Sequence, residues 1–272
     1  MTIRLALCVV ALVAGGAAGA AAQEDIGFEA IPERTVVTPP FTDAQVSEFI
    51  TTLDALLARQ TDPAKWAADA RIHLWRLLNR LQTGTLDPQQ EAQIIRHFAD
   101  LKGKHPAEAA LFTTVQELVL TRTIGKLAPD IVGEDYDGVE FRLSDYRGKV
   151  VVLVFSGEWC VPCLGEYPYQ KFLMDLYKEK PFTVLSVNSD STLDVARKAK
   201  ADHDLTYRSW WDGYLEKSQQ GPIATAWGVV GWPTIYVLDA RGVIRFVNLR
   251  QEDLLRGVRQ LMEDLERRTA KK

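Results

Sequence analysis

The sequence predicts an α/β fold in which helices flank a mixed sheet, with a small all-helical region before it. In the first half of the chain, apolar residues recur at helical spacing. The second half contains runs of β-branched residues, such as "KVVVLVF" at 149–155, which are typical of buried central strands. Strands and amphipathic helices alternate there before a closing hairpin and helix. That order favours a sheet that combines parallel and antiparallel strands.

Length and composition limit the possible functions. The chain has 272 residues, which favours two folded units. Its content of 47% hydrophobic and 25% charged residues is that of an ordinary globular protein. The formal net charge of −4 gives no electrostatic reason to expect nucleic acid as a partner.

Residues 1–22 predict a secretory signal peptide. Arg4 and the amino terminus form a short positive region, "LALCVVALVA" is an apolar stretch of secretory length, and Ala20-Ala21-Ala22 offers a cleavage site. We therefore expect export to the periplasm or cell envelope, with an uncleaved membrane anchor as the alternative. Residues 23–40 lack periodicity and predict an extended linker.

Residues 41–123 predict a helical N-terminal region of four short helices. Thr42 and Gln45 form a capping-box pattern at the start of the first helix. The histidines and tryptophans of the region have no matching ligands near them, so we expect them to pack or to face solvent. A protein-interaction module is one interpretation of this region, whose role stays open. Two of its helices open with an N-cap aspartate followed by a proline, at Asp62-Pro63 and Asp87-Pro88.

Residues 124–272 predict the domain that contains the sheet. Each expected strand or hairpin is identified by β-branched runs or by a turn residue pair, and each helix by its apolar stripe. In chain order we expect a hairpin turning at Asp137-Gly138, a central strand at 149–155, a helix, a buried strand at 182–188, a hairpin turning at Arg241-Gly242 and a helix at 251–268.

Two cysteines, Cys160 and Cys163, follow the central strand directly, and the third lies in the predicted signal peptide. A disulfide across two residues closes a very small loop, so it would stabilise the fold little. Because the strand runs straight into a helix, we expect Cys160 at a helix N-terminus, where the thiol pKa falls and the reactive thiolate is favoured. Cys160 is then the attacking thiol, and Cys163 on the same face resolves the mixed disulfide.

Three further residues are expected to assist this dithiol. Glu166 comes three residues after Cys163; if it is partly buried, its pKa rises and it can exchange protons with the cysteines. A solvated glutamate is the alternative. Pro162 suits the first helical turn and is expected to influence the redox potential. Pro233 precedes a strand, and a cis Trp232–Pro233 bond would present the Trp232 backbone to an extended peptide.

The motifs "WCVPC" at 159–163, "CLGEYP" and "GWPT" at 231–234 resemble those of the thioredoxin fold. The resemblance is closest to the exported thiol–disulfide oxidoreductases of the TlpA/ResA type, including their extra N-terminal hairpin, and it covers Leu127 to the C-terminus. It implies that the first cysteine attacks, that the second resolves and pairs with it, that the glutamate lies near both, and that the proline is cis. The residues concerned are Cys160, Cys163, Glu166 and Pro233 as the reacting set, with Trp159, Pro162, Trp232 and Pro233 expected to bind substrate.

The chain departs from the family pattern at Val154, where cytoplasmic thioredoxins have a buried aspartate. Proton handling would then depend on Glu166 or on water. Between the second strand and Pro233 lies a long stretch with Trp210, Trp211 and Tyr214. These aromatic residues either shape a substrate surface or simply pack.

Two other activities are weaker alternatives. A thiol peroxidase on a related fold would need a Thr or Ser three residues before its reacting cysteine and a Pro seven before, where this chain has Gly157 and Leu153. Zinc needs four ligands and one C-x-x-C pair supplies two, although soft thiolates could hold copper for delivery.

The sequence thus predicts an exported thiol–disulfide oxidoreductase, preferably a reductase of protein disulfides, with no cofactor beyond its dithiol. The expected partners are disulfide-containing exported proteins and a membrane thiol donor. A donor is required because an oxidising compartment does not keep thiols reduced.

Overall fold

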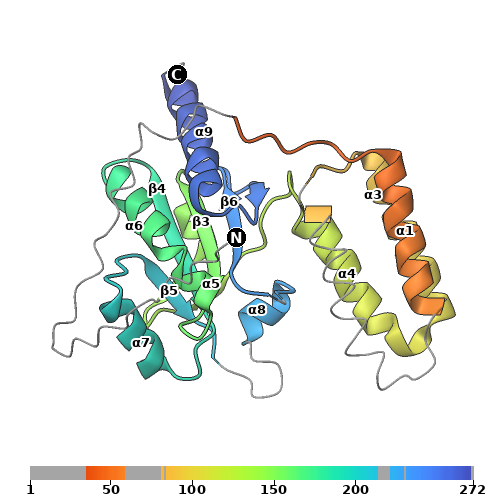
Figure 1. Ribbon diagram of the computed structural model, residues 1–272, viewed down its shortest axis with the longest axis horizontal. Coiled ribbons are helices and arrows are strands. Elements are labelled where there is room, and N and C mark those ends of the chain that lie inside the picture. The colour runs from red at the N-terminus through yellow and green to blue at the C-terminus, as the bar shows by residue number, and fades with distance from the viewer. Residues whose placement is uncertain (1–34, 59–80, 83, 214–220, 230, 271–272) are drawn as a thin grey trace, which may run out of the picture.

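The computed structural model describes residues 35–58, 81–82, 84–213, 221–229 and 231–270. The chain forms a helical part and a sheet part that lie side by side (Figure 1). The predicted signal peptide, the first residues of the predicted linker, and the predicted helix after Asp62-Pro63 lie outside the described residues. Within the described residues, no helix is both long enough and apolar enough to cross a membrane.

The helical part packs around one apolar core. Its third helix begins as expected, because the Asp87 carboxylate accepts from the backbone N–H groups of Gln89 and Gln90 and completes a capping box. Phe98 lies at the centre of the core, with its ring 6.3 Å from that of Phe49. The described helices are α1 (Asp43–Ala58), α3 (Pro88–Lys104), η2 (Pro106–Glu108) and α4 (Ala109–Thr121).

The sheet part contains a five-stranded sheet in the order β5-β4-β3-β6-β7 and a separate two-stranded hairpin, β1-β2. β3 pairs in parallel with β4 and antiparallel with β6, so the sheet is mixed, as the sequence predicts. Every residue of β3 and β4 is buried, which accounts for their continuous apolar runs. The strands are β1 (Val132–Glu134), β2 (Glu140–Arg142), β3 (Val150–Ser156), β4 (Phe182–Asn188), β5 (Arg208–Trp211), β6 (Thr234–Leu238) and β7 (Ile244–Val247).

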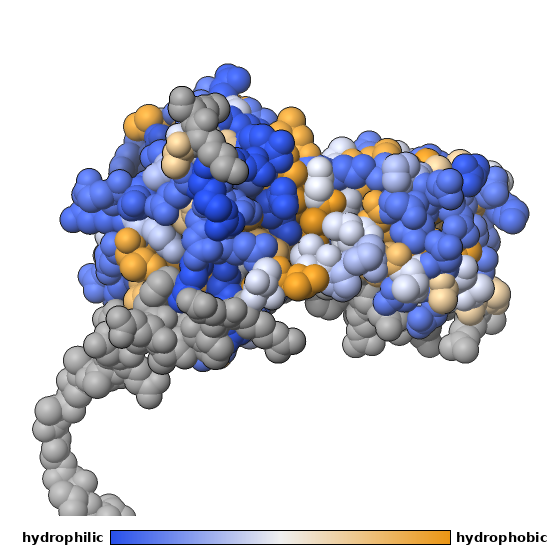
Figure 2. Space-filling view, turned by 90° about the horizontal axis from the view of Figure 1, so that it is seen from above, coloured by the Kyte–Doolittle hydropathy of each residue, from blue (hydrophilic) through white to orange (hydrophobic). Residues whose placement is uncertain are grey.

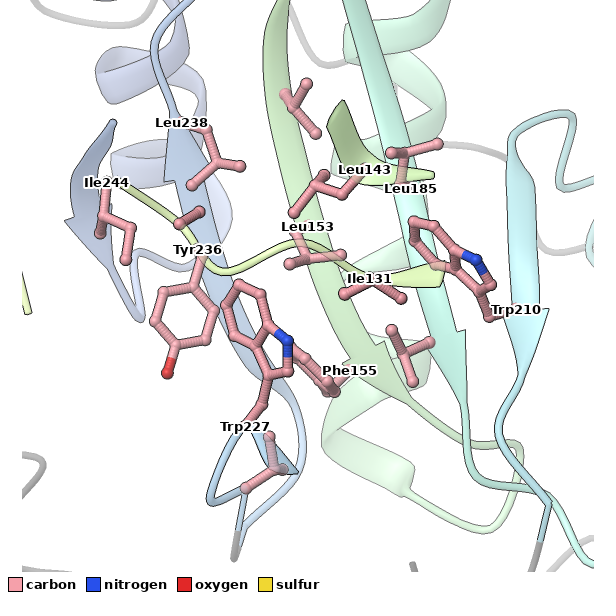
Figure 3. Close-up of a cluster of buried hydrophobic side chains, with 14 of the residues drawn as sticks. Ile131, Leu143, Leu153, Phe155, Leu185, Trp210, Trp227, Tyr236, Leu238 and Ile244 are labelled. Atoms are coloured by element: carbon pink, nitrogen blue, oxygen red, sulfur yellow. The ribbon is translucent and has the colours of Figure 1, made fainter. Parts of the chain in front are cut away.

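Helices and the hairpin cover the faces of this sheet with two apolar clusters. One cluster packs α6 and α9 against it. The other brings residues of the β1–β2 hairpin and of α8 onto β3, β4 and β6, and Figure 3 shows Phe155, Trp227 and Tyr236 packed together there. This arrangement confirms the predicted thioredoxin-like fold class. The remaining elements are η3 (Leu143–Tyr146), α5 (Val161–Leu164), α6 (Tyr167–Leu176), α7 (Leu193–Asp202), α8 (Pro222–Ala226) and α9 (Gln251–Thr269).

The aromatic residues of the long connection are divided between packing and partial exposure. Trp210 lies in β5, is fully buried, and stacks on Phe141 of the hairpin with ring centroids 4.0 Å apart. It therefore packs the core and does not shape a substrate surface. Trp211 is half-buried and donates its indole N–H to the Asp190 carbonyl. Tyr214 lies outside the described residues.

The helical and sheet parts meet through a few specific contacts. Gln82 donates to the Tyr236 hydroxyl at 3.2 Å, and Lys126 pairs with Glu91. The Arg122 guanidinium, at the end of α4, donates to the Ala226 carbonyl of α8. In Figure 1, α8 lies on the side of the sheet part that faces α4, and Figure 2 shows apolar residues gathered where the two parts meet. The helical part thus rests against the segment that leads from α8 towards Pro233.

The dithiol site

The two cysteines lie just beyond the end of β3, at the start of α5. Cys160 is the N-cap of α5 and Cys163 lies within it, and their sulfur atoms form a disulfide of 2.09 Å. Both residues are buried. The backbone N–H of Cys163 donates to Sγ of Cys160 at 3.3 Å. A donor aimed at this sulfur stabilises negative charge on it and so favours the thiolate, the form of cysteine that attacks disulfides.

The segment before the cysteines is fixed by the loop that follows β4. The backbone N–H of Glu158 donates to Oδ1 of Asp190 at 2.7 Å, and the Trp159 indole N–H donates to the Ser189 carbonyl at 3.1 Å. Gly157 has no room for a side chain, because an added Cβ would lie 2.6 Å from the Trp159 ring nitrogen. Burial raises the pKa of the Asp190 carboxyl. The loop therefore aligns the cysteines through a buried acid.

Glu166 lies next to the start of the final helix. Glu166 is buried, with 3% of the residue exposed. Its Oε2 accepts from the backbone N–H of Gln251, the first residue of α9, at 3.0 Å. Burial raises the pKa of Glu166, while the Gln251 hydrogen bond and the charge of Arg250 oppose that rise without cancelling it. Of the two alternatives that the sequence left open for Glu166, its burial therefore disfavours the solvated glutamate.

The residues before β6 face the cysteine segment. The Trp232–Pro233 bond is cis, and Pro233 is buried. The Trp232 ring makes an edge contact with the Trp159 ring, with centroids 5.3 Å apart. This proximity follows from the sheet, since Phe155 pairs with Thr234 in the antiparallel ladder of β3 and β6. Trp159 is 48% exposed, and Val161 and Pro162 are also exposed, so apolar surface borders the disulfide.

The chain is similar in sequence to known thiol–disulfide oxidoreductases, as expected for a protein with this pair of cysteines. A thiol–disulfide oxidoreductase ResA from Geobacillus thermodenitrificans is 35% identical over 135 residues, which are 48% of this chain and 74% of that protein. ResA from Geobacillus kaustophilus is 33% identical over 141 residues, which are 51% of this chain and 78% of that protein. The chain belongs to the TlpA/ResA-type redoxins. As such it is a thiol–disulfide oxidoreductase, and the Cys160–Cys163 pair is its dithiol.

Further likenesses cover the same half of this redoxin. The AhpC/TSA family model matches residues 124–247. A thioredoxin domain of a thiol–disulfide oxidoreductase from Bacteroides vulgatus aligns with a TM-score of 0.47 and 28% identity, over 52% of this chain and 98% of that one. A secreted thiol–disulfide isomerase from Corynebacterium glutamicum aligns with a TM-score of 0.43 and 28% identity, over 50% and 83%.

Several residues around the dithiol of this redoxin were not singled out by the sequence. Asp190 follows a predicted strand that neighbours the cysteine strand, so its place at the shared carboxyl edge was a usable signal. His203, at the end of α7, contacts the Glu158 carboxylate at 3.1 Å and packs its ring near that of Tyr167. Arg250 carried no signal, because it lies outside every motif. Among the residues that the structure describes, no group of three or more His, Cys, Asp or Glu side chains could hold a metal ion.

Proposed function

We propose that this redoxin is an exported reductase of protein disulfides in which Cys160 attacks and Cys163 resolves. The observation that carries the proposal is the backbone donor of Cys163 aimed at Sγ of Cys160, with the buried Glu166 close by in sequence and in the fold. The donor favours a thiolate on Cys160, and the thiolate is the nucleophile in disulfide exchange.

The reduction takes place in two exchanges. The Cys160 thiolate attacks one sulfur of the substrate disulfide, and the other substrate sulfur leaves as a thiolate that takes a proton. Cys163 then attacks Sγ of Cys160 and releases the second substrate sulfur, which also takes a proton. Two electrons and two protons pass to the substrate, and the chain is left with the Cys160–Cys163 disulfide.

Glu166 is proposed to move these protons. Its raised pKa keeps more of the carboxyl protonated than an exposed glutamate would be at the same pH. A proton held there can pass to a departing thiolate, directly or through water. Because Val154 stands where cytoplasmic thioredoxins have a buried aspartate, that role would fall to Glu166 or to water.

The substrate backbone is proposed to lie along Trp232 and Pro233, with Trp159 and Pro162 beside it. The Trp159 and Trp232 rings contact each other beside the cis bond, so the two indoles would border the bound peptide. Apolar surface at Trp159 would contact the side chains that flank the substrate disulfide. The substrates would be exported proteins that carry disulfides.

The reductive direction requires a thiol donor outside this chain. We propose a membrane protein that carries electrons from the cytoplasm, because an exported dithiol would otherwise stay oxidised. Measurement of the reduction potential of the Cys160–Cys163 couple tests the direction, with Cys163→Ser as the control. A value near about −270 mV supports a reductase, and a value near about −120 mV would make the protein an oxidant.

Export is tested on the whole chain produced in a bacterial host. Mass spectrometry of the envelope fraction should find a protein that begins at Gln23, as the predicted cleavage after Ala22 requires. A protein that keeps residues 1–22 in the membrane fraction would indicate the anchored alternative. Recovery of the intact chain from the cytosol alone would contradict export.

A further inference from the structure

Arg250 lies at the junction of the two halves of the dithiol site. It precedes α9, and its guanidinium donates to the carbonyl of Pro233. The same group lies 3.4 Å from Oδ1 of Asn248 and donates to the Leu249 carbonyl at 3.1 Å. The side chain is half-buried, and burial lowers its pKa. A half-buried cation is thus attached to the loop that borders the disulfide.

The turn that holds Arg250 is fixed to the strand that begins after Pro233. Asn248 donates its backbone N–H to the Ile235 carbonyl at 2.7 Å, and its side-chain oxygen accepts from the Ile235 N–H at 3.2 Å. Asn248 adopts a left-handed conformation, with φ of +59°, to make both bonds. Since both polar groups of Ile235 are held, the position of Arg250 relative to Pro233 is defined by backbone contacts.

The next residue reaches the other half of the site. Gln251 donates its N–H to Glu166, so neighbouring residues contact the Pro233 carbonyl and the Glu166 carboxylate. Two groups on this turn favour the charged form of Glu166, the Gln251 N–H and the Arg250 cation. Through its backbone, Glu166 also contacts the dithiol segment, because its N–H donates to the Cys163 carbonyl at 3.0 Å.

Arg250 stands at the N-terminus of α9, where helices usually favour acidic residues over basic ones. Arg250 is the N-cap of α9 and makes no side-chain cap, and a cation at a helix N-terminus is repelled by the helix dipole. Such local conflicts tend to occur where a residue serves a site. Glu252 and Asp253 in the first turn offset the charge in part.

We propose that Arg250 is a positioning residue of the dithiol reaction, holding the carbonyl of Pro233 beside the turn from which Gln251 donates to the carboxylate of Glu166. The inference rests on the proposed roles of these two residues. The Pro233 contact fixes the loop along which the substrate backbone lies. Burial raises the pKa of Glu166, and the charge of Arg250 opposes that rise, so Arg250 contributes to the pH range in which Glu166 supplies a proton.

The test compares Arg250→Gln, Arg250→Lys and a matched control, Arg241→Gln, an exposed arginine at the opposite end of β6. The rate of insulin reduction and its KM are measured against pH, and a Glu166→Gln variant identifies the step in the profile that belongs to Glu166. Arg250→Gln should move that step to higher pH, because the opposing cation is lost. It should also raise the KM for insulin about tenfold, because the Pro233 carbonyl loses its donor.

Arg250→Lys keeps the charge and loses the planar fork, so it should preserve the pH step and still raise KM. It also provides a readout if the glutamine variant does not fold. If neither variant differs from Arg241→Gln in the pH step or in KM, the inference is wrong and Arg250 only packs. Absence of insulin reduction by the unaltered chain would instead refute the proposed function, and the inference with it.

Discussion

The helical part and the sheet part of the chain bury different kinds of side chains. The core of the helical part is made of apolar residues from α1, α3 and α4, such as Val46, Ile94 and Phe98. Gln90 is buried beside that core, where it completes the capping box of α3. The sheet part also has apolar cores, but polar residues are buried in β3, β4 and β5, in the loops that follow these strands, and in the segment after the cysteines. They are Ser156, Glu166, Gln170, Ser186, Asn188, Ser189, Asp190, Ser209 and Asp212.

This difference shows that the unfavourable burial of polar groups is concentrated in the part of the chain that contains the dithiol. Burying a polar group is unfavourable unless hydrogen bonds replace its water. Here Asp190 holds the segment before Cys160, and Glu166 accepts from the start of α9, so each buried acid fixes part of the site. The helical part shows no comparable cluster among its described residues. We infer that it contributes packing and support, whereas the reacting groups lie in the sheet part.

From the difference between the two parts, we expect the largest loss of stability for Phe98→Ala in the core of the helical part. Phe98 is fully buried, so the cavity left behind should cost about 3–5 kcal/mol of unfolding free energy, measured by urea titration. The reduction potential of the dithiol should not change. Leu120→Ala on α4, where the side chain is 39% exposed, is the control and should have little effect on stability. A change in the potential of the Phe98 variant would contradict the separation of roles.

Glu166→Gln should give the reverse result. The amide oxygen can still accept from Gln251, so thermal unfolding should be nearly unchanged, while the rate of insulin reduction falls roughly a hundredfold. The rate of the variant should also lose the pH dependence that the carboxyl contributes. An active variant with an unaltered pH profile would exclude Glu166 from proton transfer.

Asp212 tests whether buried acids make the sheet part sensitive to pH. Its carboxylate accepts from the N–H groups of Ile223 and Ala224 in α8, and burial raises its pKa from 3.8 to about 6. The folded state then holds the proton more tightly than the unfolded state, so stability is lost as pH rises from about 4 to 6. The loss is roughly 2–3 kcal/mol.

Asp212→Asn removes this contribution and should flatten the dependence of unfolding free energy on pH between 4 and 7. A smaller slope should remain, because burial also raises the pKa values of Glu166 and Asp190. Denaturant titrations at several pH values compare the two proteins. Equal slopes would show that Asp212 does not titrate in this range.

The smallest predicted effect concerns the contact between the two parts. Gly228 has a φ of +62°, and an added Cβ would lie 2.6 Å from Cδ1 of Leu118 on α4. Gly228→Ala should therefore destabilise the chain by roughly 1–2 kcal/mol from the backbone alone, with a further loss from the clash. Gly125→Ala is the matched control, since it has a φ of +91° and open space around it. Equal losses in both variants would mean that α4 does not press on Gly228.

The sequence predicted those features that depend on local patterns. Continuous β-branched runs identified β3 and β4, and Asp87-Pro88 identified the start of α3. The spacing of Cys160 and Cys163 identified the dithiol. β5 was missed, because it lies at the edge of the sheet beside β4, within a stretch without clear alternation.

The tertiary contacts of the site could not be predicted in the same way. Asp212 holds α8 from the loop after β5, Asp190 holds the segment before the cysteines, and Gln251 reaches Glu166 across 85 positions of sequence. Each bond depends on how two distant backbones meet. No periodicity or spacing within either segment carries that information.

The hydrogen bond from Gln251 to Glu166 also makes the last helix a reporter of the reaction. A neutral carboxyl accepts a hydrogen bond less strongly than a carboxylate does. Each time Glu166 gains a proton, the first turn of α9 is therefore held less firmly. Amide hydrogen exchange at Gln251 would then follow the protonation of a group 85 positions away in the sequence, with no probe attached to the cysteines.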